Sequence, residues 1–379
     1  MKYWFKEFVK AHRWIYITYF YVMSFVVNFI KLFVTPDDRL ILFVSYGGKH
    51  YSDSPKIIYE AMLHDDRFSG FKFVWGFVNP DDFIVDGAQK VKLDTLRYYY
   101  IALKARVWVT NVMIERALRF RGKNTYYLCT NHGIPLKGAK NNGTTFTSLT
   151  TCLYDNILAQ SEIDVQFQQQ TFNIDRDKIL MLGYPRNDKF REDPKSSIEK
   201  VRKHFNLPND KQIILYAPTY RDWNKGVEIS PLHIEKWQEI LGGQAVLLYR
   251  AHPTVKANIM ESDFFKDASK YEDLDELLMA TDLLISDYSS LFFDYSITHK
   301  PMICWAYDYE KFCEYRELRV DLIHEVFGGQ ITEDELIQFV AKGDYRQMVA
   351  MAKSFQEKYV TVSGIATQKT LDLIHSRIS

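Results

Sequence analysis

The chain has 379 residues, of which 47% are hydrophobic and 25% are charged, and its formal net charge is zero. This apolar content excludes a disordered chain, and the balanced charge provides no overall positive field for nucleic acid. Any charged ligand must therefore be bound locally, and the length predicts two domains of ordinary size.

The N-terminal segment differs in composition from the rest of the chain. Residues 14–30 contain no charged side chain, and basic residues flank them, namely Lys2, Lys6, Lys10, Arg13 and Lys31. The run is at the lower limit for spanning a bilayer, and its many aromatic residues are typical of a helix that lies among lipid headgroups. We predict a monotopic membrane-associating segment over residues 1–34, with a spanning helix or a core helix as alternatives. The large residues at its end argue against a signal peptide.

The next part of the chain, residues 35–190, alternates short apolar runs with longer amphipathic ones. The runs at 40–44, 72–77, 107–110 and 126–129 predict buried strands with helices between them. This is βαβ construction, and it predicts a first Rossmann-like domain.

A second series of strands follows the polar stretch at 191–203, with runs at 213–216, 245–249, 283–286 and 301–305. We therefore expect a second Rossmann-like domain over residues 191–379. Two facing, doubly wound domains would form one cleft, and ligands of such sheets bind beyond the carboxyl ends of the strands.

The cysteines carry no site of their own. Cys129, Cys152, Cys304 and Cys313 form no CxxC pair and have no histidine at zinc spacing. They predict reduced thiols in a cytoplasmic compartment.

His132 is the first candidate for chemistry, because it follows the predicted strand at 126–129 in a loop that contains Gly133 and Pro135. An imidazole has an unperturbed pKa of about 6.5, which suits a general base near neutral pH. Gly133 would let a substrate approach the backbone closely. For His132 alone, a loop histidine with structural hydrogen bonds is the alternative.

A second histidine occupies the same position in the other half, because Arg250 and His252 follow the strand at 245–249. A guanidinium offers several donors to phosphate oxygens, and a protonated His252 could neutralise charge on a departing phosphate. An arginine paired with an acid is the alternative.

The strand at 283–286 runs into Asp287, Ser289 and Ser290, which open a predicted helix that carries Asp294. Backbone NH groups at such a helix start can bind a pyrophosphate. Asp294, one turn further on, is placed to accept hydrogen bonds from ribose hydroxyls. Plain N-capping by Ser289 is the alternative.

The strand at 213–216 adds Pro218, Thr219 and Arg221 to the same edge. They supply a hydroxyl and a guanidinium, and an ion pair of Arg221 with Asp222 is the alternative. The sequence lacks the motifs GxxxxGK[ST], GxGxxG, HExxH and GxSxG, which disfavours the enzyme classes that depend on them.

Taken in order, these motifs resemble the CDP-glycerol glycerophosphotransferase family of teichoic acid enzymes. The resemblance covers most of the chain and is carried by residues 51–60, 132–137, 183–188, 217–221, 250–253 and 287–294. It implies a two-domain GT-B architecture of the α/β class. One departure is Ile134, which stands where many members carry threonine.

The resemblance also implies roles for individual residues. His132 would activate the acceptor hydroxyl, and His252 would lie at the donor phosphates. The expected substrate-binding residues are Gly133, Ile134, Pro135, Lys137, Arg186, Pro218, Thr219, Arg221, Arg250, Asp287, Ser289, Ser290 and Asp294. No cofactor or metal is required by these residues, and a magnesium ion stays optional.

The implied substrates are CDP-glycerol and an undecaprenyl-diphosphate-linked disaccharide, at the cytoplasmic face of the cell membrane. The chain is similar to the primases of the family, since one transferase unit and a membrane segment account for its length. A polymerase, a CDP-ribitol transferase and a capsule polyol-phosphate transferase are close alternatives. A sugar-nucleotide transferase or epimerase and a membrane-bound scaffold are more distant ones.

Overall fold

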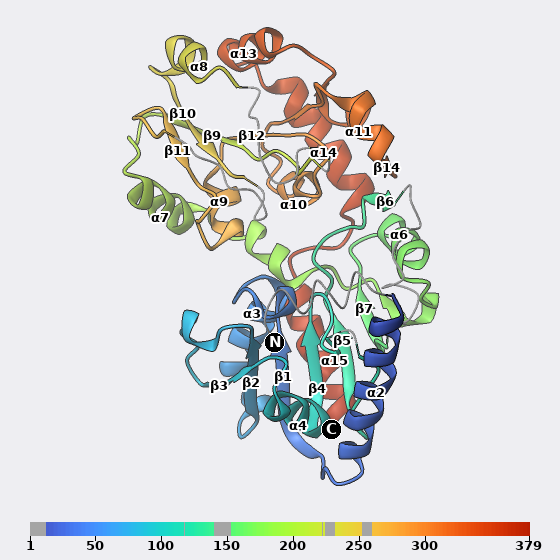
Figure 1. Cartoon of the computed structure of the whole chain (residues 1–379). Helices are drawn as coiled ribbons and strands as arrows, with labels where there is room; N and C mark the ends of the chain where they lie inside the picture. Colours follow the sequence, from blue (N-terminus) through green and yellow to red (C-terminus); the bar gives the residue numbers. More distant parts are fainter. Residues whose placement is uncertain (1–12, 117, 140–152, 222, 224–231, 252–259) are drawn as a thin grey trace.

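The structure is a computed structural model that describes residues 13–116, 118–139, 153–221, 223, 232–251 and 260–379. In these residues two parallel β-sheets form the framework, one in each half of the chain, with helices packed around them (Figure 1). The parallel α/β class expected from the sequence is therefore confirmed.

The first sheet has seven strands in the described residues, all paired in parallel, in the order β3-β2-β1-β4-β5-β7-β8. These are β1 (Asp37–Val44), β2 (Lys72–Phe77), β3 (Ala88–Lys92), β4 (Ala105–Thr110), β5 (Tyr126–Cys129), β7 (Asn156–Leu158) and β8 (Ile179–Leu180). The four predicted strands lie in β1, β2, β4 and β5. Their sequences reveal them because central parallel strands are covered on both faces; the last five residues of β1 are all buried.

The second sheet has six parallel strands in the described part of the chain, in the order β11-β10-β9-β12-β13-β15. These are β9 (Gln212–Tyr216), β10 (Ala245–Tyr249), β11 (Phe265–Asp267), β12 (Leu283–Ser286), β13 (Met302–Trp305) and β15 (Phe327–Gly329). The second series of predicted strands lies in β9, β10, β12 and β13. In both sheets the chain starts in the middle and moves to one edge before it crosses to the other side, and this change of direction is where such sheets bind ligands.

The helices connect the strands and flank the sheets. The α-helices are α2 (Arg13–Lys31), α3 (Asp53–Leu63), α4 (Leu96–Lys104), α6 (Glu162–Phe172), α7 (Lys195–Phe205), α8 (Ile234–Leu241), α9 (Leu274–Ala280), α10 (Leu291–Ser296), α11 (Tyr309–Tyr315), α12 (Leu322–Glu325), α13 (Glu333–Lys342), α14 (Arg346–Tyr359) and α15 (Ala366–Ile378). Short 3₁₀ turns are η1 (Tyr46–Gly48), η2 (Asp66–Phe68), η3 (Pro80–Asp82), η4 (Arg176–Lys178) and η5 (Pro185–Arg191). The turn η5 carries the chain from the first sheet toward the second.

A loop of the first half also reaches into the second half. Strand β6 (Lys137–Ala139) pairs antiparallel with β14 (Arg316–Leu318), so two segments far apart in the sequence form a small separate sheet. Just before β6, the side chains of Ile134 and Leu136 are buried in the apolar cluster of the second half. The two halves are therefore joined by side-chain packing as well as by the chain itself.

Helix α2 contains the charge-free run and packs against the first half with one side. Its residues Phe20 and Val27 are 3% and 1% exposed. Ser24 Oγ accepts from the backbone NH of Arg119 at 2.9 Å, and Asn28 Nδ2 donates to the Arg119 carbonyl oxygen at 2.8 Å. The segment expected to be separate from both domains thus contributes to the core of the first.

The opposite side of α2 carries exposed apolar residues. Trp14, Phe25, Phe29 and Phe33 at or just beyond the helix are 70%, 71%, 53% and 75% exposed. Among the described residues, one helix is long and apolar enough to cross a membrane, over Trp14–Lys31 with a mean hydropathy of 1.3. Length and composition alone do not place a helix in a membrane, so the membrane association stays a prediction.

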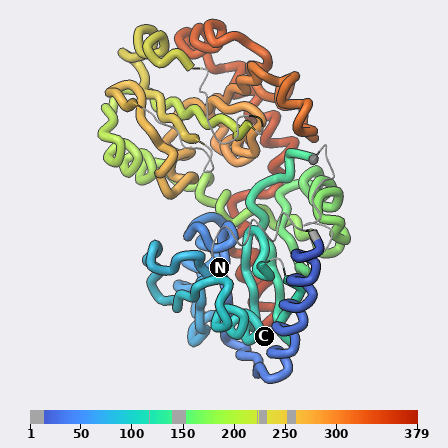
Figure 2. Tube along the Cα trace, in the orientation of Figure 1, coloured from blue at the N-terminus to red at the C-terminus, as the bar shows by residue number. Residues whose placement is uncertain are grey.

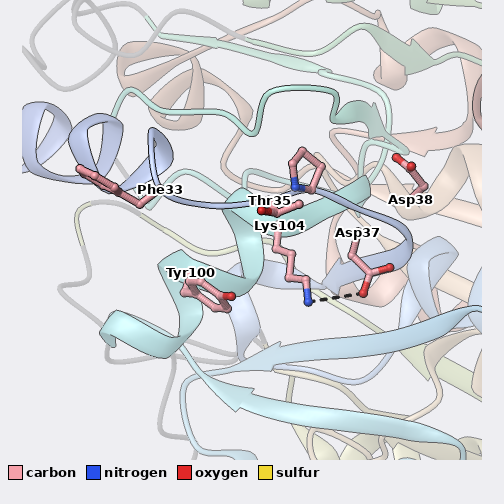
Figure 3. A pocket seen from close by; sticks show the side chains of 7 residues that line it. Phe33, Thr35, Asp37, Asp38, Tyr100 and Lys104 are labelled. Atoms are coloured by element: carbon pink, nitrogen blue, oxygen red, sulfur yellow. Dashed lines mark ion pairs between the residues drawn. The ribbon is translucent and has the colours of Figure 1, made fainter.

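A hollow of about 380 Å³ lies next to the end of α2, lined by Phe33, Thr35, Pro36, Asp37, Asp38, Tyr100 and Lys104 (Figure 3). Lys104 Nζ lies 3.5 Å from the carboxylate of Asp37, which also pairs with Lys72. Asp37 begins β1, so this hollow is at the amino end of the first sheet. It lies at the opposite end of β1 from the loop that follows Val44.

The C-terminal helix α15 returns to the first half (Figure 2). Leu371 and Ile374 are buried in the same apolar cluster as Tyr59 and Met62 of α3. Asp188 accepts from the backbone NH groups of Ala366 and Thr367 and so caps the start of α15. The structure therefore differs from the expected boundary, which placed all of 191–379 in the second domain.

Candidate active site

Gly133 and Arg186 of the first half meet Ser290 and Asp294 of the second half near the carboxyl ends of β5 and β12. Gly133, in the loop after β5, has φ +136°, and a Cβ atom there would lie 3.3 Å from Ser290 Oγ and 3.7 Å from Arg186 Nη2. A side chain at this position would crowd Ser290 Oγ in a backbone conformation that other residues rarely adopt. Glycine thus allows the His132 loop to lie against the start of α10.

His132 is exposed at this edge, and its orientation is fixed by the backbone. Nδ1 lies 3.0 Å from the carbonyl oxygen of Asn111. A carbonyl oxygen only accepts hydrogen bonds, so Nδ1 of the neutral ring carries the proton and Nε2 presents a lone pair. The ring also packs edge-on against Tyr46, with centroids 6.0 Å apart. This arrangement suits a general base.

Asn111 belongs to a buried network that the sequence did not reveal. Its Oδ1 accepts from the backbone NH of Tyr46 at 2.8 Å, and its Nδ2 donates to Asp53 Oδ2 at 3.0 Å. The Tyr46 hydroxyl donates to the same carboxylate oxygen at 2.7 Å. Tyr46, Asp53 and Asn131 all have positive φ, of 45°, 64° and 56°. Strained backbone of this kind is concentrated at functional sites.

Arg186 joins this network to the second half. Its Nη1 donates to Asp53 Oδ1 at 3.2 Å, and its Nη2 donates to both carboxylate oxygens of Asp294 at 3.1 and 3.2 Å. The three side chains are 6%, 3% and 11% exposed. Burial would lower the pKa of Arg186, but the two carboxylates outweigh it and raise that pKa well above its usual value. The guanidinium is therefore a permanent charge inside the protein.

Asp294 was expected to accept hydrogen bonds from ribose hydroxyls. In the structure its carboxylate meets Arg186, and Oδ1 also accepts from Asn187 Nδ2 at 3.1 Å. These contacts explain its position by packing and charge, and the ribose contact stays a prediction.

Ser289 and Ser290 lie at the start of α10 as expected. Ser289 Oγ accepts from the backbone NH of Leu291 at 3.2 Å, so the capping alternative accounts for its hydroxyl. Ser290 makes no side-chain cap in this helix, and its hydroxyl faces Gly133. The phosphate role of these residues stays a prediction.

The loop from Ile134 to Lys137 has mainly structural contacts. Ile134 is 4% exposed in the apolar cluster of the second half, so the ethyl branch that stands in place of a threonine hydroxyl is buried. The Pro135 carbonyl oxygen accepts from Arg319 Nη1 at 2.9 Å. Lys137 lies over the ring of Phe312 at 5.7 Å. This loop therefore positions His132 relative to the second half.

Arg221 and Asp287 form a second buried ion pair. Arg221 Nη2 lies 2.7 Å from Asp287 Oδ2, and the guanidinium donates to both oxygens of Asp308 at 2.7 and 3.0 Å. Arg221 is 7% exposed. The alternative for Arg221 was an ion pair with Asp222, which lies outside the described residues; in the described residues Arg221 pairs with Asp287 and Asp308. These carboxylates engage the guanidinium, and its role in substrate binding stays a prediction.

Thr219 is held at the end of β9 by its backbone NH, which donates to Asp287 Oδ1 at 2.9 Å. Its hydroxyl is buried and has no hydrogen-bond partner in the described ranges. Buried polar groups are normally paired, so this oxygen is a candidate ligand contact. The neighbouring Pro218 is buried.

Arg250 follows β10, and its Nη1 donates to the carbonyl oxygens of Ala268 and Tyr271, each at 2.8 Å. Within the described ranges no carboxylate forms an ion pair with it, and burial lowers the pKa of its guanidinium. A desolvated cation with donors to spare suits phosphate oxygens better than Arg221 does. The second predicted catalytic residue, His252, lies outside the described residues.

Asp275 at the start of α9 is another residue that sequence reasoning missed. Burial raises its pKa to about 8, against the opposing charge of Arg186, and the carboxylates of Asp273 and Asp53 add to the rise. Strongly shifted carboxyl groups gather at functional sites. No motif marked Asp275, because its partners come from α3, η5 and α10.

The described residues contain no group of three or more histidine, cysteine, aspartate or glutamate side chains that could hold a metal ion. The expectation that the reaction needs no cofactor stays a prediction.

Known proteins of similar sequence belong to the same family that the motifs resemble. The family model described as CDP-Glycerol:Poly(glycerophosphate) glycerophosphotransferase matches residues 26–376. The chain is 34% identical to the teichoic acid poly(glycerol phosphate) polymerase of Staphylococcus epidermidis, over 90% of this chain and 51% of that protein. It therefore spans about half the length of that relative.

Two other relatives are matched along most of their length. The teichoic acid glycerol-phosphate transferase of Staphylococcus aureus is 32% identical over 82% of this chain and 85% of its own. The teichoic acid glycerol-phosphate primase of Bacillus subtilis is 26% identical over 95% and 97%.

A solved structure of the wall teichoic acid polymerase TagF, a histidine-to-asparagine variant soaked with CDPG, resembles the fold with a TM-score of 0.84. It has 30% identity and covers 94% of this chain and 93% of that one. The match supports the expected GT-B type of architecture.

Proposed function

Since the chain belongs to the CDP-glycerol:poly(glycerophosphate) glycerophosphotransferase family, we propose that it transfers glycerol phosphate from CDP-glycerol to a lipid-linked acceptor hydroxyl in wall teichoic acid synthesis. The observation that carries the proposal is the orientation of His132. Its Nδ1 is held by the Asn111 carbonyl, which leaves Nε2 to accept a proton at the edge where the two halves meet.

The proposed reaction is one displacement at the phosphorus that bears glycerol. The acceptor oxygen attacks this phosphorus and forms the new O–P bond, while its proton passes to Nε2 of His132. The bond from the same phosphorus to the CMP oxygen breaks, and CMP leaves with the electron pair and the negative charge. The imidazolium then loses its proton to solvent.

The donor phosphates are proposed to bind at the second half. Arg250 offers a desolvated guanidinium without a carboxylate partner in the described residues, and the Thr219 hydroxyl is buried and unsatisfied there. Backbone NH groups at Ser289 and Ser290 complete the proposed contacts. His252 is proposed to meet the charge on the leaving CMP. Magnesium remains optional.

The proposed acceptor is an undecaprenyl-diphosphate-linked disaccharide at the cytoplasmic face of the membrane, with α2 as a peripheral or monotopic anchor. The support is that one side of α2 is packed on the protein while the aromatic side is exposed. Aromatic side chains of this kind favour the interface between lipid and water.

We propose a primase, which adds the first glycerol phosphate unit. Two relatives matched over 85% and 97% of their own length are a glycerol-phosphate transferase and a glycerol-phosphate primase. A polymerase is the second candidate, because the fold matches TagF with a TM-score of 0.84. The number of units in the product distinguishes the two, and CDP-ribitol as donor tests the remaining alternative.

The test is release of CMP from CDP-glycerol in the presence of a synthetic lipid-linked disaccharide, with mass spectrometry of the product. We expect one added unit of glycerol phosphate with the wild type. His132→Gln should lose roughly 10²- to 10⁴-fold in kcat, because a positioned base contributes that much. His64→Gln, at an exposed histidine after α3, is the matched control. Absence of product with both CDP-polyols, or normal turnover of His132→Gln, would contradict the proposal.

A further inference from the structure

We propose that Asp53 is a positioning residue for His132 and acts through Asn111, an inference that rests on the proposed function. The three residues form one hydrogen-bonded chain. Asn111 Nδ2 donates to Asp53 Oδ2 at 3.0 Å, and the Asn111 carbonyl oxygen accepts from Nδ1 of His132 at 3.0 Å. A change at Asp53 therefore reaches the imidazole through a single residue.

Asn111 can link the position of Asp53 to that of His132 because both polar atoms of its side chain are hydrogen-bonded. It is 1% exposed, its Oδ1 accepts from the backbone NH of Tyr46, and its Nδ2 is bound by Asp53. The carbonyl that meets His132 cannot rotate away without breaking a buried hydrogen bond. A buried polar group left unpaired in this way destabilises the conformation that leaves it so.

Asp53 is itself held firmly. Its φ of +64° is unfavourable for an aspartate, and such strain persists only where the surroundings impose it. The carboxylate accepts from the Tyr46 hydroxyl at 2.7 Å and from the backbone NH of Ser54 at 2.5 Å. Burial would raise the pKa of Asp53, but Arg186 and these donors lower it below its usual value. The acceptor is therefore ionised at neutral pH.

A purely structural role is the alternative, because Asp53 also pairs with Arg186. The two roles predict different observations. Loss of the ion pair with Arg186 changes stability and donor binding. Loss of positioning changes which nitrogen of His132 carries the proton, since the hydrogen bond at Nδ1 sets the tautomer.

The test uses the full chain and Asp53→Asn. Asparagine has the same size and tolerates positive φ, so the backbone is spared. Its amide NH₂ replaces a carboxylate oxygen and faces the NH₂ of Asn111, so that two donors oppose each other. Asp65→Asn is the matched control, because Asp65 pairs with Arg67 beside α15 and makes no contact with His132 or Asn111.

Two measurements are made on each variant. The first is kcat and KM for CDP-glycerol. The second is the nitrogen-15 spectrum of the imidazole rings in protein labelled at its ten histidines. The signals of His132 are identified as those missing from His132→Gln. We expect Asp53→Asn to lower kcat by about 10- to 100-fold with a smaller change in KM, as for other groups that orient a catalytic residue. Its His132 signals should depart from the pattern of a ring protonated at Nδ1, while Asp65→Asn matches the wild type.

An exchange of the two side chains provides the rescue. Asn111→Asp alone would place two carboxylates against each other and should also lower kcat. The double variant Asp53→Asn with Asn111→Asp restores a donor opposite an acceptor, so it should recover at least about tenfold in kcat over either single variant and regain the Nδ1-protonated pattern. This comparison also decides the matter if Asp53→Asn alone does not fold.

The inference is overturned if Asp53→Asn keeps the wild-type imidazole signals, whatever its activity, or if the exchange recovers neither signals nor kcat. Failure of the proposed function is a separate outcome. If the wild type releases no CMP from CDP-glycerol, the spectra still report whether Asp53 sets the tautomer of His132.

Discussion

Arg186 and Asp294 form a buried ion pair between the two halves of the chain, with Nη2 lying 3.1 and 3.2 Å from the two carboxylate oxygens. The other nitrogen of the same guanidinium faces Asp53 of the first half. One arginine in the connecting turn thus neutralises a carboxylate on each side of the site.

Replacing this arginine should destabilise the protein. Arg186→Met keeps the length of the side chain but leaves Asp53 and Asp294 buried without a cation, which costs roughly 3–5 kcal/mol. The free energy of unfolding in urea at neutral pH measures the loss. Arg67→Met is the control, since Arg67 forms ion pairs at a more exposed position and should cost about 1 kcal/mol or less. If the two variants lose the same free energy of unfolding, the buried ion pairs of Arg186 stabilise the protein no more than the exposed ones of Arg67 do.

Asp275 should make stability fall as pH rises. Its pKa is about 8 in the folded protein, against a usual value of 3.8, so between these values the folded state binds a proton that the unfolded state lacks. The free energy of unfolding then decreases with rising pH through this window. Each unit of upward shift corresponds to about 1.4 kcal/mol, although solvent access to the side chain reduces the effect. Asp275→Asn should therefore be flatter than the wild type from pH 5 to 8 and more stable at pH 8.

The control for this profile is Asp273→Asn at the cap of the same helix. Burial would raise the pKa of Asp273, but the Glu276 backbone NH and Lys189 lower it below its usual value. Asp273 therefore stabilises the folded state above the pKa that it has in the unfolded chain, and this stabilisation is lost as pH falls. The free energy of unfolding thus changes with pH in the opposite direction to that expected from Asp275. A wild-type profile that Asp275→Asn leaves unchanged would show that this carboxyl group titrates normally.

The two arginines at strand ends should respond differently to substitution. Arg250→Met should weaken CDP-glycerol binding by roughly tenfold or more, because a charged hydrogen bond contributes about 1.5–3 kcal/mol. Arg221→Met should mainly lower the free energy of unfolding, since it leaves Asp287 and Asp308 without their cation. Calorimetry with CDP-glycerol and urea unfolding of both variants separate the effects. Unchanged donor affinity in Arg250→Met would remove it from the phosphate site.

Helix α2 should bind lipid through its exposed side. Replacing Phe25, Phe29 and Phe33 together by serine should reduce binding to anionic vesicles at least tenfold, since each buried ring contributes roughly 1.5–3 kcal/mol. Unfolding should change little, because these side chains lie outside the core. Val27→Ser is the control on the packed side of α2. It should lower the free energy of unfolding and leave vesicle binding largely unchanged. Vesicle binding that survives the triple change would place the membrane contact elsewhere.

Deleting residues 1–34 would not isolate the role of α2 in membrane binding, although the sequence suggests a separate segment. The deletion would remove Phe20 and Val27 from the core of the first half and leave apolar surface uncovered. We expect the truncated protein to lose stability whether or not α2 meets a membrane.

Sequence patterns revealed the central strands and missed the edges. Strands β2 and β10 are continuous apolar runs because both faces are covered, and their predicted bounds match. Strand β3 is a polar edge strand with one buried residue, and β15 contains two glycines, so neither carries that signal. The return of α15 to the first half depends on contacts between residues some three hundred positions apart.

The site was predictable where it follows strands and not where it depends on distant partners. His132, Arg250 and Ser290 stand at strand ends, which motifs and spacing identify. Asp53 and Asn111 belong to the candidate site because of hydrogen bonds between separate segments of the chain. Their spacing in the sequence does not predict these hydrogen bonds. The ion pair of Arg221 with Asp308 could not be predicted for the same reason, because the two residues are 87 positions apart.

The insertion of Ile134 and Leu136 into the second half restricts how the two halves can move apart. The side chains are 4% and 2% exposed, and swinging the halves fully apart would bring both into water at a cost of roughly 3–6 kcal/mol. A rotation that keeps these two side chains buried avoids this cost, so we expect them to act as a pivot. Admission of donor and departure of product would then proceed by twisting about the residues next to His132, which stay still while the outer rims of the sheets move most.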